Sequence, residues 1–249
     1  MSARNLYFEY SDLGGAPAAQ LSDSERKKLG FKTAERVHGA LTARVEKRAL
    51  VWVAERMPGW VNSDHLTALG AVAQFLAGVT YALTRFSPRW LIATNGLIVL
   101  NWFGDSLDGT LARVRNRQRP RYGFYVDHVT DTFGAAFLMG GLAFSGYLHW
   151  GVAVAMLVAF LMLSVEVYLT TYTLGQFKLS YGKFGPTEIR IALCVGNIAL
   201  MYRPWVHFFG HQVRLFDVGG VVAAVAMLGI MVVSTIQHTR RLYREERLG

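Results

Sequence analysis

The chain has 249 residues, of which 52% are hydrophobic and 17% are charged, and its formal net charge is +9. This composition, with a mean hydropathy of +0.25, excludes an ordinary soluble domain of this size. The single cysteine, Cys194, excludes an intrachain disulfide framework. Because long apolar segments recur, we expect an all-α polytopic membrane protein, whose positive charge meets anionic lipid headgroups rather than nucleic acid.

The region before the first apolar segment divides into two parts. Residues 1–23 are mixed in composition, and we expect them to be poorly ordered. In residues 24–60, basic side chains alternate with apolar ones until Pro58 and Gly59 end the pattern. The pattern predicts an amphipathic helix lying in the membrane interface. The alternative is a solvated, charged helix that packs on a soluble partner.

Six apolar segments follow, each with roughly the 20 residues that a helix needs to cross the hydrocarbon layer. We expect them to form one domain over residues 61–238, followed by a basic cytoplasmic tail over residues 239–249. The predicted spans are 65–85, 89–113, 125–148, 150–173, 187–204 and 217–238.

The positive charges predict how these spans are oriented. With the N-terminus inside, 22 of the 26 Lys and Arg residues fall in segments on the cytoplasmic side. This bias follows the positive-inside rule for an even number of spans. We therefore expect an integral, multi-pass membrane protein with both termini in the cytoplasm.

Four aspartates lie around the connection between the second and third spans. Asp105 and Asp108 are three residues apart, and Asp127 and Asp131 are four apart, so each pair shares one face of a helix. A short Arg-rich turn joins the two helices, which makes them antiparallel neighbours. The two pairs can therefore converge on one pocket at the cytoplasmic face.

Four neighbouring carboxylates repel one another unless a cation neutralises them. Hard divalent cations prefer oxygen ligands, and Mg²⁺ or Mn²⁺ leaves positions for phosphate oxygens. We predict that Asp105, Asp108, Asp127 and Asp131 hold one such metal ion, or two that share a ligand. The alternative is a set of helix-end acids paired with nearby arginines.

Other residues of the motif suit a diphosphate. Gly109, Ala112 and Gly123 are small, so a ligand can approach the helix backbone closely, and Arg113 can bind phosphate oxygens in a bidentate fork. The expected reaction is displacement at phosphorus. Asp131 lies deepest in its span, and we predict that it is the base that takes a proton from the attacking hydroxyl.

The whole pattern resembles the signature of the CDP-alcohol phosphotransferases (also called CDP-alcohol phosphatidyltransferases). All eight signature positions are filled: Asp105, Asp108, Gly109, Ala112, Arg113, Gly123, Asp127 and Asp131. The Asn62–Gly70 segment, the six spans and the interfacial helix are also similar to that family, over roughly residues 40–238.

The resemblance implies an enzyme of phospholipid biosynthesis that takes a CDP-linked donor and an alcohol acceptor and releases CMP. It implies Asp105, Asp108 and Asp127 as metal ligands and Asp131 as the base, which can also contact a second metal. It places Gly109, Ala112, Arg113 and Gly123 around the CDP moiety. It further implies a homodimer. We favour CDP-diacylglycerol as the donor; the alternative is a CDP-choline or CDP-ethanolamine transferase acting on a diacylglycerol-like acceptor.

Three further residues are candidates for the acceptor site. Glu166 lies in the middle of the fourth span, where it could line the acceptor cavity or pair with a neighbouring helix. Glu188 and Arg190 lie in the first turn of the fifth span. The carboxylate of Glu188 could stabilise the positive N-terminal end of the helix dipole, or both residues could contact substrate. The Gly185–Arg190 stretch has a short similarity to choline/ethanolamine phosphotransferases.

Two other kinds of function are compatible with intramembrane acids. A cation-coupled transporter would scatter its aspartates toward the middle of the membrane and over several helices. A membrane scaffold with a decayed active site would have lost at least one acid. The four aspartates instead cluster at one face with an arginine and glycines, which favours the enzyme.

Overall fold

The computed structural model describes residues 35–37, 43–178, 185–208 and 210–247. These residues form a predominantly α-helical protein, so the all-α prediction is confirmed for them. The helices are α3 (Ala43–Arg56), α4 (Ser63–Leu83), α5 (Trp90–Val114), α6 (Pro120–Phe144), α7 (Trp150–Leu174), α8 (Pro186–Tyr202) and α9 (Leu215–Glu245).

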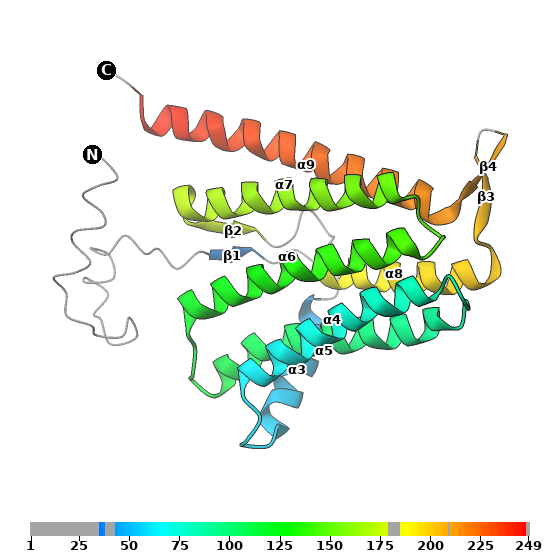
Figure 1. Ribbon diagram of the computed structural model, residues 1–249. Coiled ribbons are helices and arrows are strands. Elements are labelled where there is room, and N and C mark those ends of the chain that lie inside the picture. The colour runs from blue at the N-terminus through cyan, green and yellow to red at the C-terminus, as the bar shows by residue number, and fades with distance from the viewer. Residues whose placement is uncertain (1–34, 38–42, 179–184, 209, 248–249) are drawn as a thin grey trace, which may run out of the picture.

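The helices α4 to α9 coincide with the six predicted apolar segments. They lie roughly side by side, and α3 packs at the end of the bundle where α5 ends and α6 begins (Figure 1). By length and composition, helices α4, α7 and α9 are long and apolar enough to cross a membrane. Helix α9 continues beyond the predicted boundary at residue 238 to Glu245, so much of the predicted tail is helical.

Two short sheets depart from the predicted organisation. β1 (Glu35–Val37) pairs in parallel with β2 (Gln176–Lys178), and β3 (Trp205–Phe208) pairs with β4 (His211–Arg214) as a hairpin. The prediction of one helix over residues 24–60 is therefore wrong at Glu35–Val37, whose backbone hydrogen-bonds with a distant segment. The expected disorder of residues 1–23, and the predicted helix over residues 24–34 and 38–42, lie outside the described residues.

Helix α4 packs extensively against both α5 and α6, and glycines allow this close approach. At the α4–α5 crossing, a Cβ on Gly104 would lie 2.6 Å from the carbonyl oxygen of Leu66. At the α4–α6 crossing, Gly78 and Gly141 face each other, and a Cβ on either would collide with backbone atoms of α6 or α4. Small residues let membrane helices associate through close backbone packing.

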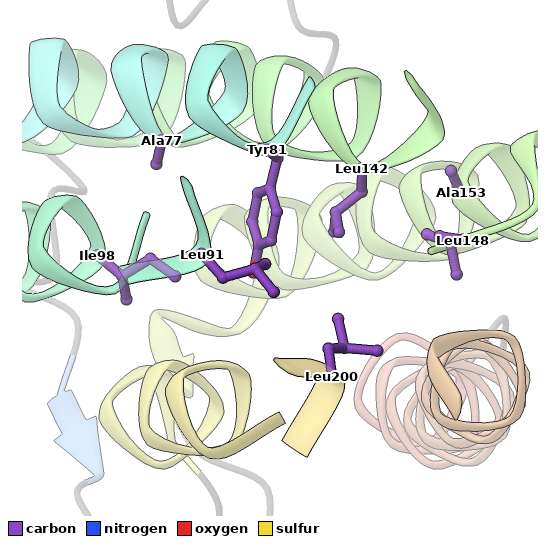
Figure 2. Close-up of a cluster of buried hydrophobic side chains, with 8 residues drawn as sticks. All are labelled: Ala77, Tyr81, Leu91, Ile98, Leu142, Leu148, Ala153 and Leu200. Carbon is purple, nitrogen blue, oxygen red and sulfur yellow. The ribbon is translucent and has the colours of Figure 1, made fainter. Parts of the chain in front are cut away.

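The largest group of buried apolar side chains lies in the half of the bundle away from the aspartates. Figure 2 shows Tyr81 of α4 reaching in among Leu91, Leu142 and neighbouring side chains. Its hydroxyl donates to Oδ1 of Asn197 at 2.9 Å, and Nδ2 of Asn197 donates to Oδ1 of Asn95 at 2.7 Å. This chain of hydrogen bonds joins α4, α8 and α5 and satisfies polar groups that would be costly if left unpaired.

Candidate active site

The four aspartates line one small cavity between α4, α5 and α6. Asp105 and Asp108 lie in the last three turns of α5, and Asp127 and Asp131 lie in the first half of α6. The cavity offers ≈ 10 Å³ to the centre of a water molecule. That is about the space for one water or ion, so a nucleotide would extend beyond it. The remaining lining residues are Thr67, Gly70, Ala71, Gln74, Asn101 and Thr130.

The two aspartates of α5 are held by residues from other helices. Oγ1 of Thr67 on α4 donates to Oδ2 of Asp108 at 2.6 Å. Nη2 of Arg190 on α8 donates to Oδ2 of Asp105 at 2.6 Å in a largely buried ion pair. Nε of Arg190 also donates to Oδ1 of Asn101 at 3.0 Å, and Nδ2 of Asn101 donates to the Gly70 carbonyl oxygen at 3.0 Å. Four helices therefore meet at this site.

The charges around Asp131 are mostly of its own sign. The negative charge of an ionised Asp131 is repelled by three neighbouring carboxylates, those of Asp105, Asp108 and Asp127. It is attracted by the guanidinium of Arg190. Arg190 beside Asp105 and Arg113, which acts on Asp108, cannot together neutralise four carboxylates. The cavity is therefore a site of concentrated negative charge, which attracts a cation.

A divalent metal fits this donor set. Among the residues that the structure describes, no three Asp, Glu, His or Cys side chains are already arranged as ligands of one ion. The carboxylates nevertheless share a cavity of ionic size, and its other side-chain donors are threonine hydroxyls and amides. An all-oxygen set with several carboxylates is the kind that Mg²⁺ and Mn²⁺ take.

The predicted CDP-binding residues continue from the cavity toward the ends of α5 and α6. Arg113 folds back along its helix, so that a Cβ on Gly109 would lie 3.3 Å from its Nη1, and Nη2 donates to Oγ1 of Thr110 at 2.9 Å. Ala112 lies one turn after Asp108. Gly123 lies one turn before Asp127, and a Cβ there would meet no atom within 4 Å.

The three acceptor-site candidates lie in different surroundings. Arg190 reaches the cavity through Asp105. Glu188 accepts a hydrogen bond from the Gly185 backbone N–H at 2.9 Å, so it caps the first turn of α8. Glu166 lies at the α7–α9 contact, where its Oε1 is 2.6 Å from Nδ1 of His238 and accepts a hydrogen bond from Thr170 at 3.0 Å.

The Arg-rich connection between α5 and α6 is held to the start of α4. Arg115 donates to the carbonyl oxygens of Met57 and Pro58 at 2.9 Å each, and also to that of Val61. Arg119 forms an ion pair with Asp64. These contacts hold the α5–α6 connection against the α3–α4 connection and the first turn of α4.

Sequence reasoning gave no role to Thr67 or Asn101. Thr67 belongs to the Asn62–Gly70 segment that resembles the family, but its contact with Asp108 spans 41 residues of sequence. Asn101 had a signal that could have found it, because it is a polar residue in an apolar span, one turn before Asp105. Thr67 contacts a carboxylate directly, whereas Asn101 contacts the arginine that pairs with one, and these partners follow from tertiary geometry.

Comparison with known proteins identifies the family of the chain. The family model for CDP-alcohol phosphatidyltransferase matches residues 60–236, which is most of the chain and includes all four aspartates. The protein therefore belongs to the CDP-alcohol phosphatidyltransferase family. It is also similar to a phosphatidylinositol phosphate synthase from Cutibacterium acnes (strain DSM 16379 / KPA171202), with 35% identity over 83 residues. That match covers 33% of this chain and 38% of the relative.

Proposed function

We propose that this protein is an integral-membrane transferase of substituted phosphate groups that makes phospholipids. It moves a phosphate-linked group from a CDP-linked donor to an alcohol acceptor and releases CMP. The observation that carries the proposal is the meeting of all four signature aspartates at one cavity beside Arg190, in a chain that belongs to this family.

In this proposal each part of the site has one task. Asp105, Asp108, Asp127 and Asp131 hold Mg²⁺ or Mn²⁺, which when bound polarises phosphoryl oxygens and stabilises the departing CMP. The small residues of the motif leave room for the pyrophosphate beside α5 and α6, and Arg113 binds its oxygens. These contacts align the phosphorus with the acceptor hydroxyl.

The base in the proposed mechanism is Asp131. Its carboxylate lines the cavity with the other three and lies farther along α6 than Asp127. It is therefore placed to remove the proton from the acceptor hydroxyl as that oxygen attacks the phosphorus and the bond to CMP breaks.

CDP-diacylglycerol is the donor that we favour. A phosphatidylinositol phosphate synthase joins a phosphatidyl group to a phosphorylated polyol, and the sequence similarity to such a protein favours the same kind of pair here. The ion pair between Arg190 and Asp105 places a cation at the cavity that could also contact an anionic acceptor. The short similarity of Gly185–Arg190 to choline/ethanolamine phosphotransferases favours the second candidate, a CDP-choline or CDP-ethanolamine transferase.

We further propose that all six helices α4 to α9 cross the membrane, with the termini and the cavity on the cytoplasmic side, and that the protein is a homodimer. Helices α5 and α6 fit the span length, with 25 residues each, and their charged residues lie in the C-terminal half of α5 and the N-terminal half of α6. The Lys and Arg distribution supports the orientation.

The test uses purified protein in detergent with Mg²⁺ or Mn²⁺. Each CDP-linked donor is offered with a panel of alcohols, including inositol phosphate, glycerol phosphate, serine and diacylglycerol, and CMP release is followed. We expect CDP-diacylglycerol with a phosphorylated polyol to give the highest rate. A higher rate with CDP-choline or CDP-ethanolamine and diacylglycerol would establish the second candidate, and no CMP release with any pair would refute the proposed activity.

A further inference from the structure

One carboxylate outside the signature joins α3 both to α5, which lines the cavity, and to α8, whose Arg190 reaches Asp105. Glu46 lies in the first turn of α3, and its Oε1 accepts hydrogen bonds from Nε1 of Trp102 at 2.9 Å and from Oγ of Ser106 at 3.3 Å, both on α5. Oγ1 of Thr187 on α8 donates to Oε1 at 3.0 Å and to Oε2 at 3.2 Å. Glu46 thus contacts α5 and α8 at once.

The buried face of α3 places Glu46 in this position. Leu50 and Ala54 follow it at helical spacing and are buried against Leu107 and Leu111 of α5. Glu46 is the polar end of that face. The half-buried carboxylate accepts from three donors on two helices, and hydrogen bonds to a charged group are among the stronger ones.

The partners of Glu46 lie next to residues that line the cavity or contact it. On α5, Trp102 and Ser106 lie about 100° around the helix from Asn101 and Asp105, which contact Arg190. On α8, Thr187 lies one turn before Arg190, on the same face. The carboxylate therefore holds the two helices together beside the place where Arg190 meets Asp105.

We infer that Glu46 is a positioning residue that sets the separation of α5 and α8 and thereby holds Arg190 against Asp105 and Asn101 at the cavity. The inference rests on the proposed function, because it assigns Glu46 an effect on that same site. Glu46 itself does not line the cavity. It acts through Arg190, in the way that outer partners orient the ligands of a metal site.

The test is a double-mutant cycle between Glu46 and Arg190, which do not touch the same partner atom. The variants are Glu46→Ala, Arg190→Ala and the double variant, with Glu46→Gln and Thr187→Val as milder changes. Glu55→Ala is the matched control, because Glu55 is an exposed carboxylate on the opposite side of the same helix. CMP release gives kcat and KM, and thermal unfolding in detergent gives Tm.

We expect Glu46→Ala to lower kcat/KM by roughly 10- to 100-fold, the usual effect of losing an outer partner of a metal site. Glu46→Gln and Thr187→Val, which each remove part of the contact, should lose less, and Glu55→Ala should stay within about twofold of the wild type. In the Arg190→Ala background, Glu46→Ala should cost little more, because its effect is already lost.

If the fold-loss of kcat/KM in the double variant equals the product of the two single losses, Glu46 does not act through Arg190. That result would overturn the inference. Unchanged kinetics in Glu46→Ala and Thr187→Val would do the same. Should Glu46→Ala fail to fold, the cycle is made with Glu46→Gln. Should the wild type release no CMP with any donor, the proposed function fails, and the same cycle read in Tm decides whether Glu46 and Arg190 are coupled.

Discussion

The hydrogen bond from Thr67 to Asp108 makes a sharp prediction about metal dependence. Replacing Thr67 by Val keeps the size and branching of the side chain but removes the hydroxyl that donates to Oδ2 of Asp108 at 2.6 Å. A hydrogen bond to a charged group contributes about 1.5–3 kcal/mol. That free energy corresponds to roughly 10- to 150-fold in an equilibrium constant.

The assay is CMP release over a range of Mn²⁺ and Mg²⁺ concentrations. Because Thr67 orients a predicted metal ligand and does not itself replace one, Thr67→Val should raise the metal concentration needed for half-maximal rate about 10- to 100-fold. The rate at saturating metal should fall less. Thr67→Ser, which retains a hydroxyl, should stay close to the wild type.

Thr173→Val is the matched control for this experiment. The hydroxyl of Thr173 donates to the Leu169 carbonyl oxygen of its own helix at 2.8 Å, just as Thr67 also donates to Ser63 at 3.1 Å. Thr173 is exposed on α7, so its loss should leave metal dependence unchanged. A Thr67→Val variant with the metal dependence of the wild type would refute the argument that this contact orients Asp108.

Three other variants or treatments test the site and its scaffold. Asp131→Asn should lower turnover by about 10²–10⁴-fold while CDP binding, measured by calorimetry, largely survives; retained turnover would contradict its role as base. Excess EDTA should abolish CMP release and added Mg²⁺ or Mn²⁺ should restore it, and full rates in EDTA would contradict a metal role. Gly141→Leu should lower Tm by several degrees, because it forces α4 and α6 apart at Gly78, whereas Gly140→Leu, next to it in open space, should change Tm little.

Local pattern was sufficient to predict most of the helices and the position of the aspartates. A helix needs a fixed number of apolar residues to cross a membrane, and pairs three or four residues apart share a face. Both rules operate within one segment, so a single sequence reveals them. The β3–β4 hairpin lacks such a signal, because it follows only from how the chain connects α8 and α9.

The contacts that complete the site depend on residues far apart in the sequence. Arg190 reaches Asp105 across 85 residues, and Thr187 reaches Glu46 across 141. Glu166 had two readings, and the structure places it beside His238, 72 residues away, at the α7–α9 contact. No periodicity could have chosen these partners, because tertiary packing alone decides which polar face of one helix meets that of another.

Helix α5 has two polar faces, and contacts on both of them hold its aspartates in position. One face, with Asn101, Asp105 and Asp108, points to the cavity and is met by α4 and α8. The adjacent face, with Trp102 and Ser106, is met by Glu46 of α3. A helix held on two faces about 100° apart can neither rotate nor slide without breaking hydrogen bonds to charged groups, which are costly to lose. The carboxylates of α5 are therefore preorganised by the scaffold, and mutual repulsion at the cavity is resisted by contacts made outside it.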